Sequence, residues 1–130
     1  MKKLMCMLVA AMALGGCVQP EATQQASVYV NITAQEAKQI MDTETGYIIL
    51  DTRAQDEYDA GHIPDAVLLP VGSITKETAS AVIPEKDAVV LVYCRSGNRS
   101  KTAAKALAEL DYTNIYEFGG INAWPYEVVR

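Results

Sequence analysis

Residues 94–100 have the types and order of a loop that can hold an anion beside a nucleophile. They read Cys94-Arg95-Ser96-Gly97-Asn98-Arg99-Ser100. A cysteine thiolate is a strong nucleophile, and a glycine-containing loop allows backbone N–H groups to converge on one anionic atom. The same groups, together with the N-terminus of a following helix, favour the thiolate over the thiol. The loop therefore predicts nucleophilic chemistry at Cys94 and a small anionic ligand.

A buried strand and an amphipathic helix are expected on either side of this loop. Residues 87–93 form an apolar run that does not alternate, which is typical of a strand buried on both faces of a sheet. Residues 101–110 have helical spacing, with Ala103, Leu107 and Leu110 on one face. The cysteine thus follows a buried strand, at the edge of the sheet where open α/β folds bind their ligands.

Predicted strands and helices alternate along the rest of the chain. The further strands are expected at residues 27–32, 47–50, 67–69 and 114–118, and the further helices at residues 33–41, 54–59 and 73–81. Thr33 and Glu36 have the spacing of a capping box at the start of the first helix. This alternation predicts an α/β fold, a three-layer sandwich with a central, mostly parallel sheet and helices on both faces.

Length and charge restrict the function further. A chain of 130 residues suits one compact domain. The formal net charge of −5 argues against a general role in nucleic-acid binding, because the phosphate backbone would be repelled. Arg95, Arg99 and Lys101 are a local concentration of positive charge on this acidic background. They indicate a small anion as the ligand of the loop.

The first residues have the pattern of an export signal. A basic start precedes an apolar stretch over residues 4–14, which is too short to span a membrane as a stable helix. The run Leu14-Gly15-Gly16-Cys17 resembles the lipobox of bacterial lipoproteins, in which the cysteine is lipidated and becomes the first residue. We predict a lipoprotein signal peptide over residues 1–16, a lipidated tether over residues 17–26 and a folded domain over residues 27–130.

This signal predicts export to the bacterial cell envelope, with the domain anchored to a membrane through Cys17 and facing the periplasm or the outside. Ordinary secretion with cleavage nearby is the alternative. Of the three cysteines, Cys6 would leave with the signal and Cys17 would be blocked by the lipid. Cys94 would remain as the free thiol, so no disulfide could form within the chain. A lone thiol kept in an oxidising compartment again favours chemistry at Cys94.

Four motifs in order resemble the signatures of a single rhodanese domain. They are Ile49-Leu50-Asp51-Thr52-Arg53, Glu57-Tyr58-Asp59-Ala60-Gly61-His62-Ile63-Pro64, the loop at residues 94–100, and Gly119-Gly120-Ile121-Asn122-Ala123-Trp124. The resemblance covers residues 27–130 and implies a rhodanese-like fold and sulfurtransferase activity. A sulfane sulfur would pass from thiosulfate or a similar donor to Cys94, and the resulting persulfide would pass it to an acceptor such as cyanide or a thiol. The resemblance implies no cofactor.

The loop residues then take expected roles around the Cys94 sulfur. Substrate contacts are expected from Arg95, Ser96, Gly97, Asn98, Arg99 and Ser100. Arg95 is the candidate for the sulfonate end of the donor. Arg99 either does the same or ties the loop to the body of the protein through a carboxylate. Ser100 either caps the following helix or forms a hydrogen bond with the sulfur.

The remaining motif residues are expected to support the fold. We predict an ion pair between Asp51 and Arg53 that stabilises the loop, and a pairing of Glu57 with an arginine. His62 is the one histidine in the chain, so a hydrogen-bonded structural role is favoured over a metal site. Trp124 is expected in the core. No metal is predicted, and we expect a monomer.

Three other functions compete with thiosulfate sulfurtransfer. Phosphatases with rhodanese-like folds need an arginine six positions after the cysteine, whereas Arg99 follows Cys94 by five. The shorter loop favours sulfur over phosphate. 3-Mercaptopyruvate is a possible donor, but Arg95 favours thiosulfate. A persulfide carrier that serves a redox partner without turnover would use the same Cys94. Either sulfur function needs an external acceptor, because no second thiol remains in the chain.

Overall fold

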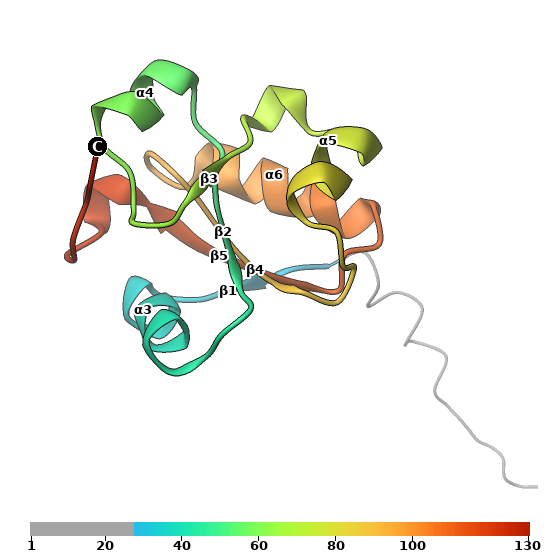
Figure 1. The fold of residues 1–130 in the computed structure, drawn as a ribbon, viewed down its shortest axis with the longest axis horizontal. Helices are drawn as coiled ribbons and strands as arrows, with labels where there is room; N and C mark the ends of the chain where they lie inside the picture. Colours follow the sequence, from blue (N-terminus) through green and yellow to red (C-terminus); the bar gives the residue numbers. More distant parts are fainter. Residues whose placement is uncertain (1–27) are drawn as a thin grey trace, which may run out of the picture.

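The computed structural model describes residues 28–130, and the predicted signal peptide, the tether and Cys17 lie outside the described residues. Five parallel strands form one sheet (Figure 1). In spatial order they are β1 (Val30–Asn31), β5 (Asn114–Gly120), β4 (Val89–Cys94), β2 (Ile48–Asp51) and β3 (Val67–Leu68). The sheet was expected to be mostly parallel, and all of its described strand pairs are parallel.

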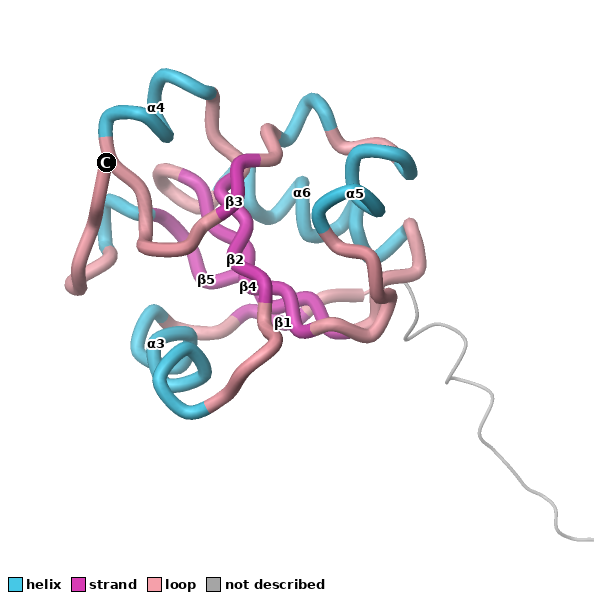
Figure 2. Tube along the Cα trace, viewed as in Figure 1, coloured by secondary structure: helices cyan, strands magenta, loops and turns pink. Residues whose placement is uncertain are grey.

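Helices cover both faces of the sheet (Figure 2). They are α3 (Ala34–Thr43), α4 (Gln55–Ala60), α5 (Lys76–Val82) and α6 (Asn98–Glu109), with short 3-10 helices η2 (Val71–Ser73) and η3 (Ile121–Ala123). One face packs against α3, and the other packs against α5 and α6. The three-layer sandwich predicted from the alternation of strands and helices is present.

The position of β4 between two layers of helices explains why its sequence does not alternate. Val90 and Val92 pack against the layer of α5 and α6, whereas Leu91 and Tyr93 pack against the layer of α3. All four side chains are fully buried. Because successive residues of a strand point to opposite faces, a strand that is covered on both faces needs an apolar side chain at every position. β4 therefore carries Cys94 at the end of the most enclosed strand in the described sheet.

Local capping defines the helix starts. At α3 the Thr33 hydroxyl accepts a hydrogen bond from the Glu36 N–H at 3.0 Å, and the Glu36 carboxylate accepts one from the Thr33 N–H at 2.8 Å. This is the predicted capping box. At α5 the Thr75 hydroxyl accepts from the Thr78 N–H at 3.0 Å, so the helix begins at Lys76. The helix expected over residues 73–81 is therefore preceded by η2 and begins later than predicted.

The predicted start of α6 is wrong in a way that affects the loop. The helix was expected from Lys101, but it begins at Asn98. Gly97 has φ of 108°, a left-handed conformation that favours glycine, and it stands at the N-cap position. Asn98, Arg99 and Ser100 consequently belong to the first turn of the helix. The alternative in which Ser100 caps α6 is therefore also wrong.

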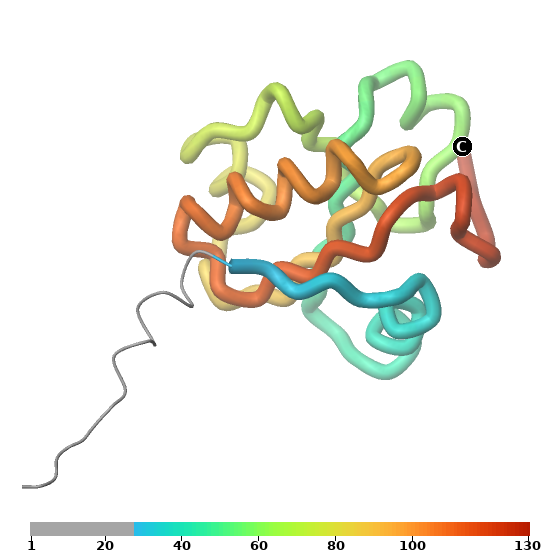
Figure 3. The backbone as a smooth tube through the Cα atoms, turned by 180° about the vertical axis from the view of Figure 1, so that it is seen from behind, coloured from blue at the N-terminus to red at the C-terminus, as the bar shows by residue number. Residues whose placement is uncertain are grey.

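Two strands of the sheet, β1 and β5, differ from expectation in length. The edge strand predicted over residues 27–32 is limited to Val30–Asn31, which pairs with β5 (Figure 3). β5 continues to Gly120, beyond its predicted end at Phe118, and reaches the neighbourhood of Cys94 through the pair Cys94–Gly120. Within residues 28–130, no helix combines the length and the apolar character needed to cross a membrane.

Candidate active site

Cys94 lies at the bottom of a short connection between β4 and α6. It is the last residue of β4, and only three residues separate it from Asn98 at the start of the helix. The Gly97 N–H donates a hydrogen bond to the Cys94 Sγ at 3.0 Å. Cys94 is 1% exposed, whereas Arg95 and Asn98 are exposed around it. The nucleophile predicted from the sequence is thus enclosed by the backbone of its own loop.

The surroundings of Cys94 favour its thiolate. Burial raises the pKa of the thiol, but hydrogen bonds with the Ser100 hydroxyl and with the backbone N–H groups of Ser100, Gly97 and Ser96 lower the pKa by more. The pKa of Cys94 therefore lies below its ordinary value. A thiolate supported by fixed backbone dipoles needs little reorganisation when charge moves onto or away from the sulfur. This arrangement suits nucleophilic attack on an electrophilic sulfur.

Arg99 ties the start of α6 to α4. Its guanidinium donates two hydrogen bonds to the Glu57 carboxylate, at 2.8 and 2.9 Å. Arg99 lowers the pKa of Glu57 to about 2, with a further contribution from the Ala54 N–H, so Glu57 stays ionised near neutral pH. Of the two roles left open for Arg99, the contact to a carboxylate of the protein body is the one present. Both side chains are partly exposed, so the pair contributes to positioning more than to stability.

A buried network supports the end of β4 from the side of β2. The predicted ion pair is present: Arg53 donates to the two oxygens of Asp51 at 2.9 and 2.7 Å. The Tyr93 hydroxyl donates to the same carboxylate at 2.7 Å, and Arg53 also donates to the Gly61 carbonyl at 2.7 Å. Burial raises the pKa of Tyr93, so its hydroxyl remains a donor. Because Tyr93 precedes Cys94, this network holds the strand that carries Cys94. Tyr93 was not expected in it.

The Gly119-Gly120 motif has a steric explanation. A Cβ added at Gly120 would lie 2.1 Å from the Arg95 carbonyl oxygen and 2.6 Å from the Ser96 Cα. The end of β5 therefore passes directly beneath the loop, and a side chain at this position cannot fit. The Asn122 N–H also donates to the Arg95 carbonyl at 3.2 Å. Two segments far apart in sequence thus fix the backbone on which Cys94 depends.

Sequence reasoning missed Glu117 of β5. Its side chain is 2% exposed, and its carboxylate accepts a hydrogen bond from the Ser100 hydroxyl at 2.5 Å. Ser100 is itself 3.4 Å from the Cys94 Sγ. The signal was the period of the strand: Glu117 stands two residues after Ile115, on the face that packs against α6. An acidic residue at such an inward position needs an explanation, because a buried carboxylate is costly without partners.

The other motif residues occupy structural positions. The His62 ring stacks on Tyr58 with centroids 3.8 Å apart, and its Nδ1 lies 2.9 Å from the Tyr58 carbonyl oxygen. Trp124 is 9% exposed and packs in the core on the α3 face. Among residues 28–130, no three His, Cys, Asp or Glu side chains are grouped as metal ligands.

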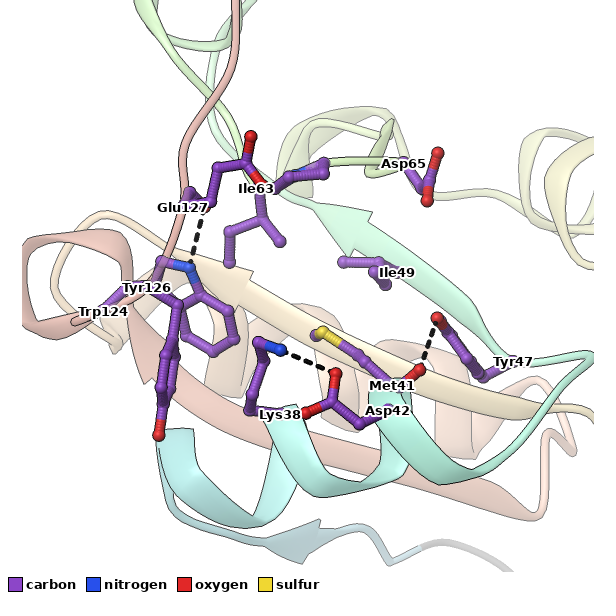
Figure 4. Close-up of a pocket in the computed structure, with 11 residues that line it drawn as sticks. Lys38, Met41, Asp42, Tyr47, Ile49, Ile63, Asp65, Trp124, Tyr126 and Glu127 are labelled. Atoms are coloured by element: carbon purple, nitrogen blue, oxygen red, sulfur yellow. Dashed lines mark hydrogen bonds and ion pairs between the residues drawn. The ribbon is translucent and has the colours of Figure 1, made fainter.

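A separate cavity of about 170 Å³ lies on the α3 face of the sheet (Figure 4). Its wall combines Met41 and Ile49 with Trp124, and a Lys38–Asp42 ion pair of 2.6 Å stands at α3. No cysteine lines this cavity. It is therefore not the place of the predicted sulfur chemistry.

Comparison with known proteins gives one family. Residues 33–126 match the family model described as "Rhodanese-like domain". The chain is 33% identical over 72 residues to the thiosulfate sulfurtransferase PspE of Escherichia coli, covering 55% of this chain and 68% of that protein. It is 30% identical over 94 residues to the putative sulfur carrier protein YrkF of Bacillus subtilis, covering 72% of this chain and 49% of that protein. The chain spans between 20% and 68% of the length of these and other curated relatives that it matches.

Solved structures agree on the fold. A rhodanese with anions from E. coli superimposes with a TM-score of 0.61 at 28% identity, covering 65% of this chain and 98% of that one. The Alr3790 protein from Anabaena sp. gives a TM-score of 0.69 at 25% identity, covering 75% of this chain and 90% of that one. The fold class expected from the sequence is confirmed.

We predict that Gly120→Ala displaces the Cys94 loop, because the added methyl group meets backbone that cannot rotate away. The free energy of unfolding should fall by about 1–3 kcal/mol, the usual range for overpacking. Urea denaturation measures this change, and the amide NMR signals of residues 95–97 should shift. Gly72→Ala is the matched control, since its Cβ would meet nothing within 4 Å. Equal effects of the two substitutions would contradict the steric role of Gly120.

Proposed function

Because the chain belongs to the rhodanese-like domain family, whose members here include sulfurtransferases and a putative sulfur carrier, we propose that it is a thiosulfate sulfurtransferase. Sulfane sulfur moves from thiosulfate, or a similar donor, through a Cys94 persulfide to a thiophilic acceptor. The observation that carries this proposal is the enclosure of the Cys94 Sγ by N–H donors at the N-terminus of α6. The protein acts as a monomer and needs no cofactor.

The first half-reaction is a displacement at sulfur. The Cys94 thiolate attacks the outer sulfur of thiosulfate, a new S–S bond forms, and sulfite leaves with the electron pair of the old S–S bond. The negative charge then lies on the outer sulfur of the persulfide. The loop N–H groups that support the thiolate can also support this anion, because both charges occupy the same small region. A phosphate would require more room and a free arginine, whereas Arg99 is paired with Glu57.

The second half-reaction regenerates the thiolate. A nucleophile such as cyanide or a thiolate attacks the outer sulfur, and Cys94 leaves as the thiolate. Within residues 28–130, Cys94 is the free cysteine, so the described domain supplies no second thiol for this step. The acceptor is therefore a separate molecule.

Arg95 is the proposed contact for the sulfonate of the donor. It is exposed beside Cys94, whereas Arg99 is engaged by Glu57. A cation at this position attracts a dianionic donor and also stabilises the sulfite that departs. The same charge favours thiosulfate over the monocarboxylate 3-mercaptopyruvate.

The second candidate function is a persulfide carrier without turnover. The similarity to the putative sulfur carrier protein YrkF favours it, although the chain covers only 49% of that protein. The two functions share the first half-reaction and differ in release. With excess thiosulfate and cyanide, a sulfurtransferase forms many equivalents of thiocyanate, whereas a carrier forms at most one.

We further propose that the mature protein is a lipoprotein of the bacterial cell envelope, anchored to a membrane through Cys17. The sequence around Leu14-Gly15-Gly16-Cys17 supports this proposal. Two or more acyl chains on this cysteine would anchor the protein stably, whereas a single chain would not.

Incubation of the protein with thiosulfate should add one sulfur to Cys94. Mass spectrometry of the Cys94 peptide should show a gain of about 32 Da, since the persulfide is the covalent intermediate of nucleophilic catalysis. Cys94→Ser should show neither this gain nor thiocyanate formation. Sulfur transfer by the Cys94→Ser protein would exclude the proposed function.

Arg95→Ala should raise the KM for thiosulfate about tenfold and change kcat less, because loss of one exposed charge-assisted contact costs about 1.4 kcal/mol. Steady-state thiocyanate formation measures both constants. Lys105→Ala is the control, since Lys105 is an exposed cation of α6 beyond its first turn. An unchanged KM in Arg95→Ala would remove Arg95 from the donor site.

Cys17→Ala should release the protein from membranes, because the substitution removes the only proposed attachment site for acyl chains. Fractionation of bacteria that express either protein measures the membrane-bound share. Continued membrane association of Cys17→Ala would count against lipidation.

A further inference from the structure

The buried carboxylate of Glu117 has hydrogen-bond donors but no basic partner. Its Oε1 accepts from the Asn31 side-chain amide at 2.7 Å. Its Oε2 accepts from the Gly119 N–H at 2.9 Å and from the Ser100 hydroxyl at 2.5 Å. In the described part of the chain, no lysine or arginine forms an ion pair with it. Burying a carboxylate without a cation costs folding free energy, so a functional reason is expected for a carboxylate that lies one hydroxyl away from Cys94.

The Ser100 hydroxyl joins Glu117 to Cys94. This hydroxyl has one proton and three near acceptors: the Glu117 Oε2 at 2.5 Å, the Gly97 carbonyl oxygen at 3.1 Å and the Gly119 carbonyl oxygen at 3.4 Å. The Cys94 Sγ lies 3.4 Å from the hydroxyl oxygen, on the donor side. The carboxylate offers both the shortest distance and a negative charge, so it takes the proton. The Ser100 oxygen then turns a lone pair toward the sulfur and accepts a hydrogen bond from the Cys94 thiol. The donation from Ser100 that lowers the pKa of Cys94 belongs to the thiolate state.

We propose that Glu117 is a positioning residue for sulfur transfer, which acts through Ser100 and shares one proton with Cys94. The role in sulfur transfer rests on the proposed function, whereas the hydrogen bonds from which it is argued do not depend on that function. In the resting state the chain runs from the thiol to the Ser100 oxygen and from the Ser100 hydroxyl to the Glu117 carboxylate. In this state each of the two protons lies between one donor and one acceptor.

Activation reverses the direction of both hydrogen bonds. The thiol proton moves to the Ser100 oxygen, and the Ser100 proton moves to Glu117. Cys94 becomes the thiolate, Ser100 now donates to it, and Glu117 becomes a carboxylic acid that donates to Ser100. No proton is gained or lost, and one negative charge moves from Glu117 to the sulfur. The thiolate can therefore form in a buried site without a proton crossing to solvent.

The charged groups around this pair come from the loop and from the elements packed against it. Asn31 of β1 is neutral, and the charged side chains on the loop and on the first turn of α6 are the cations Arg95, Arg99 and Lys101. Lysine and arginine keep their charge below about pH 10. On the neighbouring elements, Glu57 of α4 is ionised and paired with Arg99, and the Tyr93 hydroxyl of β4 donates to Asp51 of β2. A step in the reactivity profile is therefore assigned to Glu117 only where Glu117→Gln removes it.

The test is the rate at which iodoacetamide alkylates Cys94 between about pH 4 and about pH 10. Two groups that share a proton titrate in two macroscopic steps, so the logarithm of the wild-type rate should rise, level off and rise again. Glu117→Gln keeps an acceptor for Ser100 but cannot take a proton. Its profile should lose the step at lower pH and show a single rise.

Two further variants isolate the relay. Ser100→Ala breaks the chain between the two groups and should also give a single rise. Glu109→Gln removes an exposed carboxylate of α6 and should keep both steps. Circular dichroism and urea denaturation establish that each variant is folded. If Glu117→Gln fails to fold, infrared spectra between the two steps of the wild-type profile replace it: a protonated carboxylic acid band that shifts in Glu117→Asp supports the relay, and absence of that band overturns it.

The outcomes separate this inference from the proposed function, because alkylation needs no sulfur donor. A wild-type profile with one step, or a profile of Glu117→Gln that superimposes on it, would overturn the relay even if the persulfide forms. Two steps in the wild type and one in Glu117→Gln, without a persulfide after thiosulfate, would leave the relay and overturn the sulfur chemistry.

Discussion

The structure around Cys94 depends on a backbone contact. The loop after Cys94 passes so close to Gly120 that a single added carbon would overlap the Arg95 carbonyl. This contact sets the height of the loop above the sheet, and with it the approach of the Gly97 N–H to the sulfur. The buried Asp51–Arg53 pair and Tyr93 hold the strand below, and Glu57 holds α6 beside it through Arg99. The loop is therefore fixed by the elements around it together with the left-handed Gly97 within it.

Much of this arrangement follows from sequence patterns. The unbroken apolar run of β4 predicted a central strand, because covering both faces requires apolar residues at every position. The capping box at Thr33 predicted the start of α3, and the place of Asp51 and Arg53 at a strand end beside the expected site predicted their ion pair. The alternation of strands and helices predicted the layers. These features depend on local periodicity or on neighbours in sequence, which a single chain displays directly.

The features that escaped prediction depend on contacts between distant residues. The start of α6 at Asn98 follows from the left-handed conformation of Gly97 at the N-cap position. Arg99 could have bound substrate or a carboxylate, and only the position of α4 decides for Glu57. Glu117 gave a weak signal, an acidic residue at an inward strand position, but its meaning lies in Ser100 on another element. Residue spacing along the chain does not reveal which side chains of different elements will contact each other.

The burial of Cys94 also limits disulfide formation between two copies of the protein. A disulfide requires two sulfur atoms about 2 Å apart. With Cys94 1% exposed beneath its loop, two copies of the protein cannot bring their sulfurs to that distance without displacing the loop. Compact molecules of a few atoms meet a lower steric barrier than a second folded chain. The depth of the sulfur thus acts as a size filter, which protects the Cys94 thiol from dimerisation while leaving it open to small reactants.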